Sequence, residues 1–373
     1  MNQIDNVNAI RNALKEPLSS QVLQRLGQIQ DLELEQDLIS AGMVRALALD
    51  GTCLQVGLVV PYPCQSQYRE RVMSLTQALA ELPGIDEVEC ELGLAVPEIR
   101  VGGIAPIANV RNVIAVGSGK GGVGKSTTAV NLALALAAEG ARVGVLDADI
   151  YGPSVPIMLG CQDFRPVSRD GKTMEPAFAH GVSAMSMGFM VTEDNAAVWR
   201  GPMAAGALVQ LVNETQWPEL DYLVIDMPPG TGDIQLTLSQ KVPVSGAVIV
   251  TTPQEIATAD ARKGITMFNK VNIPVLGIVE NMSYHVCNQC GSKEHPFGHG
   301  GGLETAKRYN VPLLGELPLN VTVREGVDNG HPSVVAEPDG EIAQAYKAIA
   351  RKTAAALIRQ SEPQSLAIEI TLE

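Results

Sequence analysis

The sequence predicts an α/β fold with a doubly wound, mostly parallel sheet, preceded by a small α+β domain. From residue 112 onward, short β-branched runs alternate with amphipathic helical segments, a pattern typical of a parallel sheet covered on both faces. Before residue 96, helical periodicity accompanies the dipeptide Asp50-Gly51 between two strand-like runs, which is a strong hairpin signal. Residues 96–111 are rich in glycine and proline, which indicates a linker between the two parts.

The small domain is expected over residues 8–95. Apolar residues recur three to five positions apart from Val7 to Leu26, as in a helix, and Pro17 should divide this stretch in two. The other expected elements are strands at Val44–Leu49, Cys53–Val60 and Val88–Leu92 and a helix at Gln67–Leu82.

The large part is expected over residues 112–360. A final helix should run from Gly340 to Arg359, before a tail at residues 361–373. The expected strands are Val113–Val116, Val143–Leu146, Tyr222–Ile225, Ala247–Val250, Val275–Val279 and Leu313–Leu317.

Composition excludes several classes of protein. The net charge of −14 and the lack of a basic stripe argue against nucleic-acid binding. No apolar stretch is long enough to span a membrane, and the N-terminus lacks the pattern of a signal peptide. Six cysteines among 373 residues are too few for a disulfide framework. We therefore expect a cytoplasmic protein that binds neither nucleic acid nor membrane.

A glycine-rich loop follows the first strand of the large part. It reads Gly119-Lys-Gly-Gly-Val-Gly-Lys-Ser-Thr127 and leads into an Ala/Leu-rich helix. Strand, glycine loop and helix are the context of a phosphate-binding loop, in which backbone N–H groups and the helix N-terminus face the phosphates. Lys125 should neutralise the β- and γ-phosphates of ATP, and Ser126 should offer its hydroxyl to Mg²⁺. The part from residue 112 is thus predicted to be an ATPase of P-loop NTPase type.

Carboxylates follow two other strands of the same predicted sheet. Asp147 and Asp149 come after Val143–Leu146, and Asp226 ends Tyr222–Ile225 before a Pro/Gly-rich loop that reaches Asp233. We expect Asp226 to hold Mg²⁺ through water and the loop to change path when the γ-phosphate leaves. A carboxylate after a strand can also be a simple helix cap.

One further feature of the ATPase part concerns metal chemistry. Cys287 and Cys290 form a C-x-x-C pair that suits one metal centre. Four interpretations are open: a buried structural pair, a redox pair, a zinc knuckle with His295 and His299, and half of the ligand set of an iron–sulfur cluster.

Lys120, a second lysine inside the phosphate loop, resembles the signature lysine of the deviant Walker A class, which includes ParA, MinD and the nitrogenase iron protein. The resemblance implies that two subunits meet face to face and that Lys120 contacts the nucleotide of the partner. It also implies that Asp149 orients the attacking water, that Asp147 lies near the Mg²⁺ shell and that Asn281 reads the adenine edge.

A closer resemblance, over residues 110–355, is to the Mrp/ApbC family of iron–sulfur cluster carriers. It rests on the loop 119–127 and the cysteine pair, and on Asp147-Ala-Asp-Ile-Tyr-Gly-Pro-Ser154, Arg200-Gly-Pro-Met203 and Asp226-Met-Pro-Pro-Gly-Thr-Gly-Asp233. Residues 8–95 resemble the iron–sulfur assembly domain of bacterial members, whose cysteine-bearing loop is similar to Pro61-Tyr-Pro-Cys64; a buried small apolar residue is the alternative for Cys64.

The family resemblance implies a homodimeric, slow ATPase that holds a 4Fe–4S cluster between subunits and passes it to client apoproteins. Cys287 and Cys290 would be its cluster ligands. The alternative is a MinD- or ParA-like ATPase switch with a structural zinc site at the cysteine pair.

Overall fold

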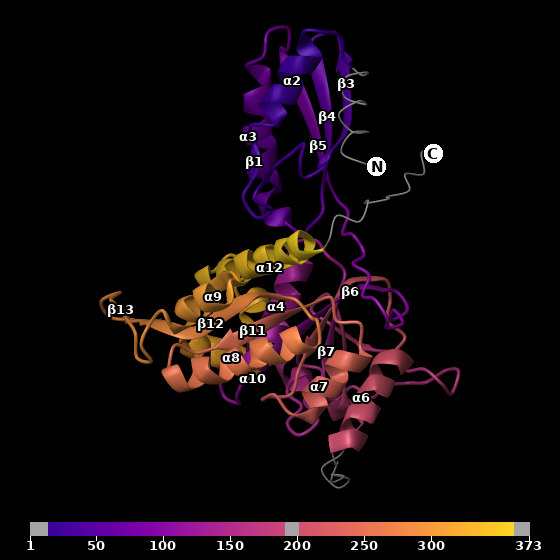
Figure 1. The fold of residues 1–373 in the computed structure, drawn as a ribbon, viewed down its shortest axis with the longest axis vertical. Helices are drawn as coiled ribbons and strands as arrows, with labels where there is room; N and C mark the ends of the chain where they lie inside the picture. The colour runs from indigo at the N-terminus through magenta and orange to yellow at the C-terminus, as the bar shows by residue number, and fades with distance from the viewer. Residues whose placement is uncertain (1–13, 191–200, 362–373) are drawn as a thin grey trace. The chain divides into compact units, whose positions relative to one another are not determined.

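The structure is a computed structural model that describes residues 14–190 and 201–361 (Figure 1). Contacts within the chain define two compact units. The smaller is Met1–Pro97 with Ala354–Glu373, and the larger is Glu98–Thr353.

The smaller unit contains a three-stranded sheet in the order β3-β4-β5. Strands β3 and β4 are antiparallel and joined at Gly51, whose φ of +62° suits glycine, so the predicted hairpin is confirmed. Strand β5 pairs with β4 in parallel, so α3 is the crossover between them. The elements are α2 (Leu18–Leu26), β1 (Gln30–Asp31), β2 (Gln36–Asp37), β3 (Val44–Asp50), β4 (Cys53–Val60), α3 (Tyr68–Ala80) and β5 (Glu87–Leu94).

The predicted helix from Val7 to Pro17 begins outside the described residues, and α2 begins directly after Pro17. The short β1–β2 hairpin was not predicted, because strands of two residues carry no periodicity.

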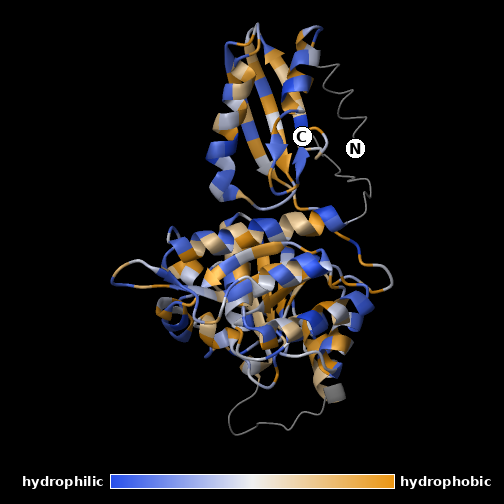
Figure 2. Cartoon of the chain, turned by 60° about the vertical axis from the view of Figure 1, so that its left-hand side comes forward, coloured by the Kyte–Doolittle hydropathy of each residue, from blue (hydrophilic) through white to orange (hydrophobic). Residues whose placement is uncertain are grey.

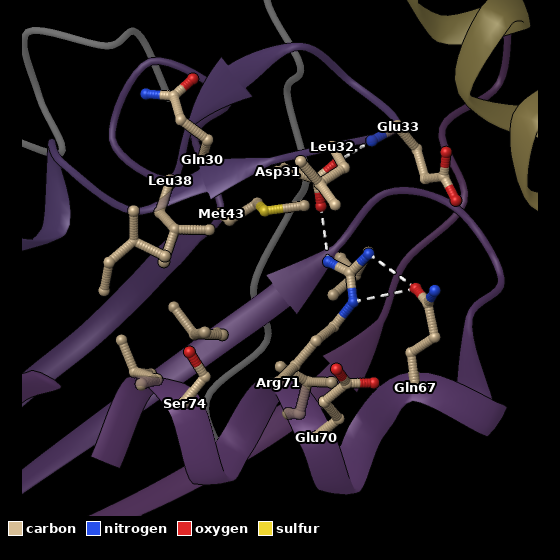
Figure 3. Close-up of a pocket in the computed structure, with 15 residues that line it drawn as sticks. Gln30, Asp31, Leu32, Glu33, Leu38, Met43, Gln67, Glu70, Arg71 and Ser74 are labelled. Atoms are coloured by element: carbon tan, nitrogen blue, oxygen red, sulfur yellow. Dashed lines mark hydrogen bonds and ion pairs between the residues drawn. The ribbon is translucent and has the colours of Figure 1, made fainter. Parts of the chain in front are cut away.

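A buried polar network joins the β1–β2 hairpin to α3 (Figure 3). The fully buried carboxylate of Asp31 accepts hydrogen bonds from Tyr62 Oη at 2.8 Å and Arg71 Nη1 at 2.5 Å. Arg71 also donates to Gln67 Oε1 at 2.9 Å. Asp31, Gln67 and Arg71 border a cavity of about 210 Å³ whose lining is partly apolar and partly polar. Cys64 is buried, as in the alternative interpretation of that residue.

The larger unit has the predicted mostly parallel sheet, which contains nine strands; β8, β9 and β13 were not predicted. The strand order is β13-β12-β11-β6-β10-β7-β9-β8, with β14 paired to β12, and only β13 and β8 run antiparallel to their neighbours. The strands are β6 (Val110–Gly117), β7 (Val143–Asp147), β8 (Ala177–Ala179), β9 (Val182–Ser186), β10 (Leu220–Asp226), β11 (Gly246–Thr251), β12 (Val275–Val286), β13 (Lys293–Glu294) and β14 (Leu313–Pro318).

Helices lie on both faces of this sheet, with β11 and β12 between α12 and α8 in Figure 1. The central strands are apolar along their length, as the orange strands of Figure 2 show, because both of their faces are buried. The helices are α4 (Lys125–Ala138), α5 (Val155–Met158), α6 (Gly201–Glu214), α7 (Asp233–Lys241), α8 (Glu255–Lys270), α9 (Gly301–Tyr309), α10 (Val321–Asp328), α11 (Ser333–Ala336) and α12 (Glu341–Gln360).

The position of β6 sets the place of the site. It lies between β10 and β11, and the strand order reverses there: β7 and β10 lie on one side of β6, and β11 and β12 lie on the other. In such doubly wound sheets, ligands bind in the crevice beyond the carboxyl ends of the strands at this switch point.

Candidate nucleotide and metal site

The predicted site residues gather at the carboxyl ends of neighbouring parallel strands. In the sheet register, Asp226 at the end of β10 is level with Asp147 on β7 and with Val116 on β6. Strand β6 then continues into the glycine loop, and Lys125 begins α4. Parallel pairing therefore places residues that are about a hundred positions apart in sequence beside one another.

The loop conformation depends on its glycines. Gly122 and Gly124 have φ values of +79° and +82°, which side chains with a Cβ rarely adopt. A Cβ on Gly119 would lie 2.1 Å from the carbonyl of Asp260, so this position has no room for one. The loop encloses a cavity of about 230 Å³, lined by Ser118, Lys120, Gly121, Gly122, Gly124, Lys125, Ser126, Thr127, Asp149, Ser154, Met158 and Pro229.

Lys125 and Asp226 form a buried ion pair. Lys125 Nζ lies 2.5 Å from Asp226 Oδ1 and 3.0 Å from Ser126 Oγ. Burial raises the pKa of Asp226, and the positive charge of Lys125 opposes that rise. Asp226 Oδ2 is buried and has no hydrogen-bond partner among the described residues. A hydroxyl beside an unpartnered carboxylate oxygen suits a hard cation, so Ser126 and Asp226 fit the Mg²⁺ that the loop implies.

Asp147 organises the segment that follows β7. Its buried carboxylate accepts hydrogen bonds at 3.1 Å from the backbone N–H groups of Asp149 and Val155 and from Ser186 Oγ. Burial, and then the charge of Asp226, raise its pKa to about 7. These contacts hold Asp149 at the cavity, where burial raises the pKa of Asp149 against the opposing effect of Lys125.

The remaining loop residues differ in how they face the cavity. Lys120 lines it and is half-exposed, and its carbonyl accepts a hydrogen bond from Ser118 Oγ at 2.9 Å. The Val123 side chain is buried in the core. Asn281 is also buried and donates from Nδ2 to the carbonyl of Val123 at 2.9 Å, so its amide contacts the loop from behind.

Three contributors to the site were not predicted as such. Ser186 supports Asp147. Gln235 Nε2 donates to the carbonyls of Pro228 and Pro229 and so fixes the loop after Asp226. Ser154 lines the cavity with a buried hydroxyl that has no partner among the described residues. Only Ser154 lay in a motif singled out in the sequence. Arg200, in another motif, is outside the described residues.

The cysteine pair lies at the tip of the hairpin formed by β12 and β13. Cys287 directly follows β12 and is half-exposed, whereas Cys290 is exposed. Cys287 N–H donates to the carbonyl of Ser292 at 2.9 Å, which closes the turn. The Sγ of Cys290 lies 3.2 Å from Ser292 Oγ. Hydrogen bonds from Ser292 lower the pKa of Cys290, which favours the thiolate that binds metals.

The two nearby histidines do not complete a zinc site with these cysteines. His295 Nδ1 is 2.8 Å from the carbonyl of Ser283, and its ring centroid lies 5.4 Å from that of His299. The described residues include no cluster of three or more His, Cys, Asp or Glu side chains arranged for a metal ion. Among the described residues, this site therefore consists of one half-exposed and one exposed cysteine, without a third ligand arranged beside them.

Two family profiles match the chain. Residues 109–354 match the family described as NUBPL iron-transfer P-loop NTPase. Residues 19–92 match the family described as iron-sulfur cluster assembly protein.

Two similar proteins are named for the carriage or transfer of iron–sulfur clusters, and a third is a solved nucleotide-binding protein. The chain is 50% identical over 348 residues to an iron-sulfur cluster carrier protein of Escherichia coli, covering 93% of this chain and 94% of that protein. It is 52% identical over 247 residues to the mouse iron-sulfur cluster transfer protein NUBPL, covering 66% and 77%. A solved nucleotide-binding protein from Archaeoglobus fulgidus, in complex with ADP, aligns with a TM-score of 0.55 and 39% identity, covering 62% of this chain and 90% of that one.

Proposed function

Because this chain belongs to the family of NUBPL iron-transfer P-loop NTPases, we propose that it is an ATP-hydrolysing iron–sulfur cluster carrier. In this proposal a homodimer holds one 4Fe–4S cluster between its subunits and passes it to client apoproteins. The observation that carries the proposal is the pair of cysteines at the hairpin tip, half-exposed Cys287 and exposed Cys290, in a chain that also has a phosphate-loop cavity.

Nucleotide binding would use the groups around the cavity. The backbone of residues 119–124 turns toward the phosphates, and Lys125 would leave Asp226 to meet the β- and γ-phosphates. When bound, Mg²⁺ supplies charge neutralisation at the phosphates. Ser126 and Asp226 would hold it, and Asp147 would act by positioning Asp149.

Hydrolysis would use Asp149 and Lys120. Asp149 lines the cavity, where a carboxylate can orient the attacking water. Lys120 is half-exposed at the cavity edge and would contact the nucleotide of a second subunit. Asn281, which donates a hydrogen bond to the carbonyl of Val123 in the loop, would read the adenine edge.

The number of thiolate ligands that a cluster needs supports a cluster shared between two subunits. A cubane cluster takes about one thiolate per iron, hence about four ligands. One chain provides a close pair, and a symmetric dimer provides two pairs across its two-fold axis. The lowered pKa of Cys290 favours metal binding, and the exposure of Cys290 favours transfer of the cluster as cargo.

The smaller unit is proposed to be an iron–sulfur assembly domain over residues 8–95, in line with its family match at residues 19–92. Residues 96–111 are proposed as the connection to the ATPase domain at 112–360. Within the described residues, no helix is long and apolar enough to cross a membrane. Cytoplasmic residence stays a prediction from cysteine usage.

A direct test is transfer of the cluster in solution. The protein is reconstituted with iron and sulfide without oxygen and mixed with an apo four-iron enzyme, whose recovered activity is followed. We expect recovery with the wild-type protein and none with Cys287→Ala or Cys290→Ala; Cys161→Ala is the matched control. Equal recovery with all variants would contradict the carrier function, and one zinc per chain lost on changing His295 or His299 would support the switch with a zinc site.

A further inference from the structure

Strand β12 contacts the phosphate loop near its middle and reaches the cysteine pair at its end. Asn281 Nδ2 donates to the carbonyl of Val123 at 2.9 Å. A Cβ on Gly124 would lie 2.1 Å from the same amide nitrogen, so Asn281 packs directly against the loop backbone. A change in loop path at Val123 or Gly124 must therefore displace Asn281 or break this bond.

The residue before Asn281 is firmly anchored. Glu280 is fully buried, and its carboxylate accepts hydrogen bonds from Ser283 Oγ at 2.6 Å and from the N–H of Gly302 at 2.5 Å. Gly302 belongs to the first turn of α9, where a carboxylate is favoured by the helix dipole. Glu280 thus fixes one side of the segment that touches the loop.

The residue after Asn281 has an irregular backbone conformation within β12. Met282 has a φ of +55°, a left-handed conformation that is uncommon for a bulky residue. The β12–β14 register also shifts here, because Glu280 pairs with Glu316 and Tyr284 pairs with Pro318. The segment 281–283 is therefore a bulge, a feature that occurs next to functional sites and re-aims the strand beyond it.

Beyond the bulge, the strand is tied to the cysteine hairpin. Lys293 Nζ lies 3.6 Å from the ring centroid of Tyr284. His285 pairs with Glu294 and Val286 with Lys293. His295 Nδ1 is 2.8 Å from the carbonyl of Ser283. The same part of β12 is also attached to Leu319, whose N–H donates to the carbonyl of Tyr284 at 2.6 Å and whose carbonyl lies 3.1 Å from His285 Nδ1. A movement at Met282 would therefore turn the hairpin about this attachment and displace Cys287 and Cys290.

We propose that Asn281 is a positioning residue that transmits the occupancy of the phosphate loop to the cysteine hairpin, with Met282 as the hinge. This inference rests on the proposed function. ATP binding reshapes the loop at Val123, Asn281 follows, and the hairpin changes the exposure of its two thiols. The nucleotide thereby sets when the thiol pair is presented.

The test uses full-length, cluster-free, reduced protein. Mass spectrometry measures the rates at which iodoacetamide alkylates Cys287 and Cys290. The rates are compared without nucleotide, with saturating Mg-ADP and with a saturating non-hydrolysable ATP analogue. We expect nucleotide to change the wild-type rate by at least about fivefold, as in ordinary allosteric coupling. Asn281→Ala and Met282→Gly should reduce this response to less than about twofold. Glycine at position 282 should weaken the coupling because it adopts positive and negative φ values about equally well, so a movement of Asn281 is no longer passed along the strand.

The control is Asn213→Ala, which removes an exposed asparagine of α6 and should keep the wild-type response. Nucleotide binding is measured for each protein with a fluorescent analogue, and Met282→Gly decides the question if Asn281→Ala fails to bind. Two results would overturn the proposed coupling through Asn281 and Met282 and leave the proposed function intact. One is a wild-type protein that binds nucleotide without a change in labelling rate. The other is a Met282→Gly protein with the full response. A wild-type protein that binds no nucleotide would overturn the proposed function as well.

Discussion

Lys125 and Asp226 are 101 positions apart in sequence, and their charged groups meet at 2.5 Å beside the phosphate-loop cavity that Lys125 lines. With nucleotide in the loop, Asp226 and the β- and γ-phosphates would compete for this one amine. We therefore expect nucleotide with Mg²⁺ to separate the pair, with the cation taking the place of the amine beside Asp226.

The first prediction concerns this exchange. Asp226→Asn should bind ATP in EDTA at least as well as the wild type, because Lys125 is released, but Mg²⁺ should no longer tighten binding. Turnover should fall by about a hundredfold or more. Titration of a fluorescent ATP analogue with and without Mg²⁺ measures both effects, and Asp163→Asn, an exposed carboxylate, is the control. Equal tightening by Mg²⁺ in Asp226→Asn would contradict the assignment.

The second prediction tests whether Lys120 acts on the nucleotide of the partner subunit. Lys120→Ala and Asp149→Ala should each bind ATP and hydrolyse it poorly. When the two are mixed and allowed to exchange subunits, half of the dimers are mixed, and each of these has one intact site. Activity should return to about a quarter of the wild-type value. A mixture as inactive as its parents would place Lys120 in its own subunit's site. Lys172→Ala, an exposed lysine, should keep full activity.

The third prediction concerns the pH dependence of thiol reactivity. The pKa of Cys290 is lowered by hydrogen bonds from Ser292, so its thiolate persists to lower pH than that of an ordinary cysteine. Ser292→Ala should raise this pKa and slow alkylation of Cys290 near neutral pH by up to about tenfold, while the rate at high pH stays unchanged. Cys161, whose pKa is raised to about 11 by burial, is the internal reference. Identical pH profiles in the two proteins would contradict the role of Ser292.

Much of the fold was predictable because its signals are local. The hairpin at Asp50-Gly51 and the strands of the large sheet follow from turn chemistry and apolar runs. The membership in the iron–sulfur carrier family was also predictable, because its motifs are contiguous in sequence. Strand β12 was predicted to end at Val279 but continues to Val286. Its polar second half is held by pairing with β13 and β14, which no local pattern reveals.

The candidate residues of the site could be named from sequence motifs, but their contacts with one another could not. The glycine loop and Asp226 are recognisable as motifs, yet their ion pair depends on the parallel pairing of β6 and β10. Ser186 and Gln235 act through single hydrogen bonds to distant elements, and neither belongs to a motif that would have singled it out. Strand β9, which carries Ser186, has few β-branched residues and was missed for that reason.

The fourth prediction concerns stability. Glu139 at the end of α4 is fully buried and pairs with Arg351 of α12 at 2.5 Å. Arg351→Ala should lower the free energy of unfolding by about 3–5 kcal/mol, because it leaves a buried carboxylate without its cation. Urea unfolding followed by tryptophan fluorescence reports this unit, since Trp199 and Trp217 both lie within Glu98–Thr353. Arg324→Ala, which removes an exposed ion pair, should cost about 1 kcal/mol or less. Equal effects of the two substitutions would refute the importance of the buried pair.

The proposal that two chains share one cluster through Cys287 and Cys290 can be examined by native mass spectrometry of protein reconstituted without oxygen, combined with iron and sulfide assays. We expect a dimer with about four irons, or about two per chain. It should lose its iron on Cys287→Ala or Cys290→Ala and keep ATP binding in both variants. A monomer that carries a complete four-iron cluster would contradict this proposal.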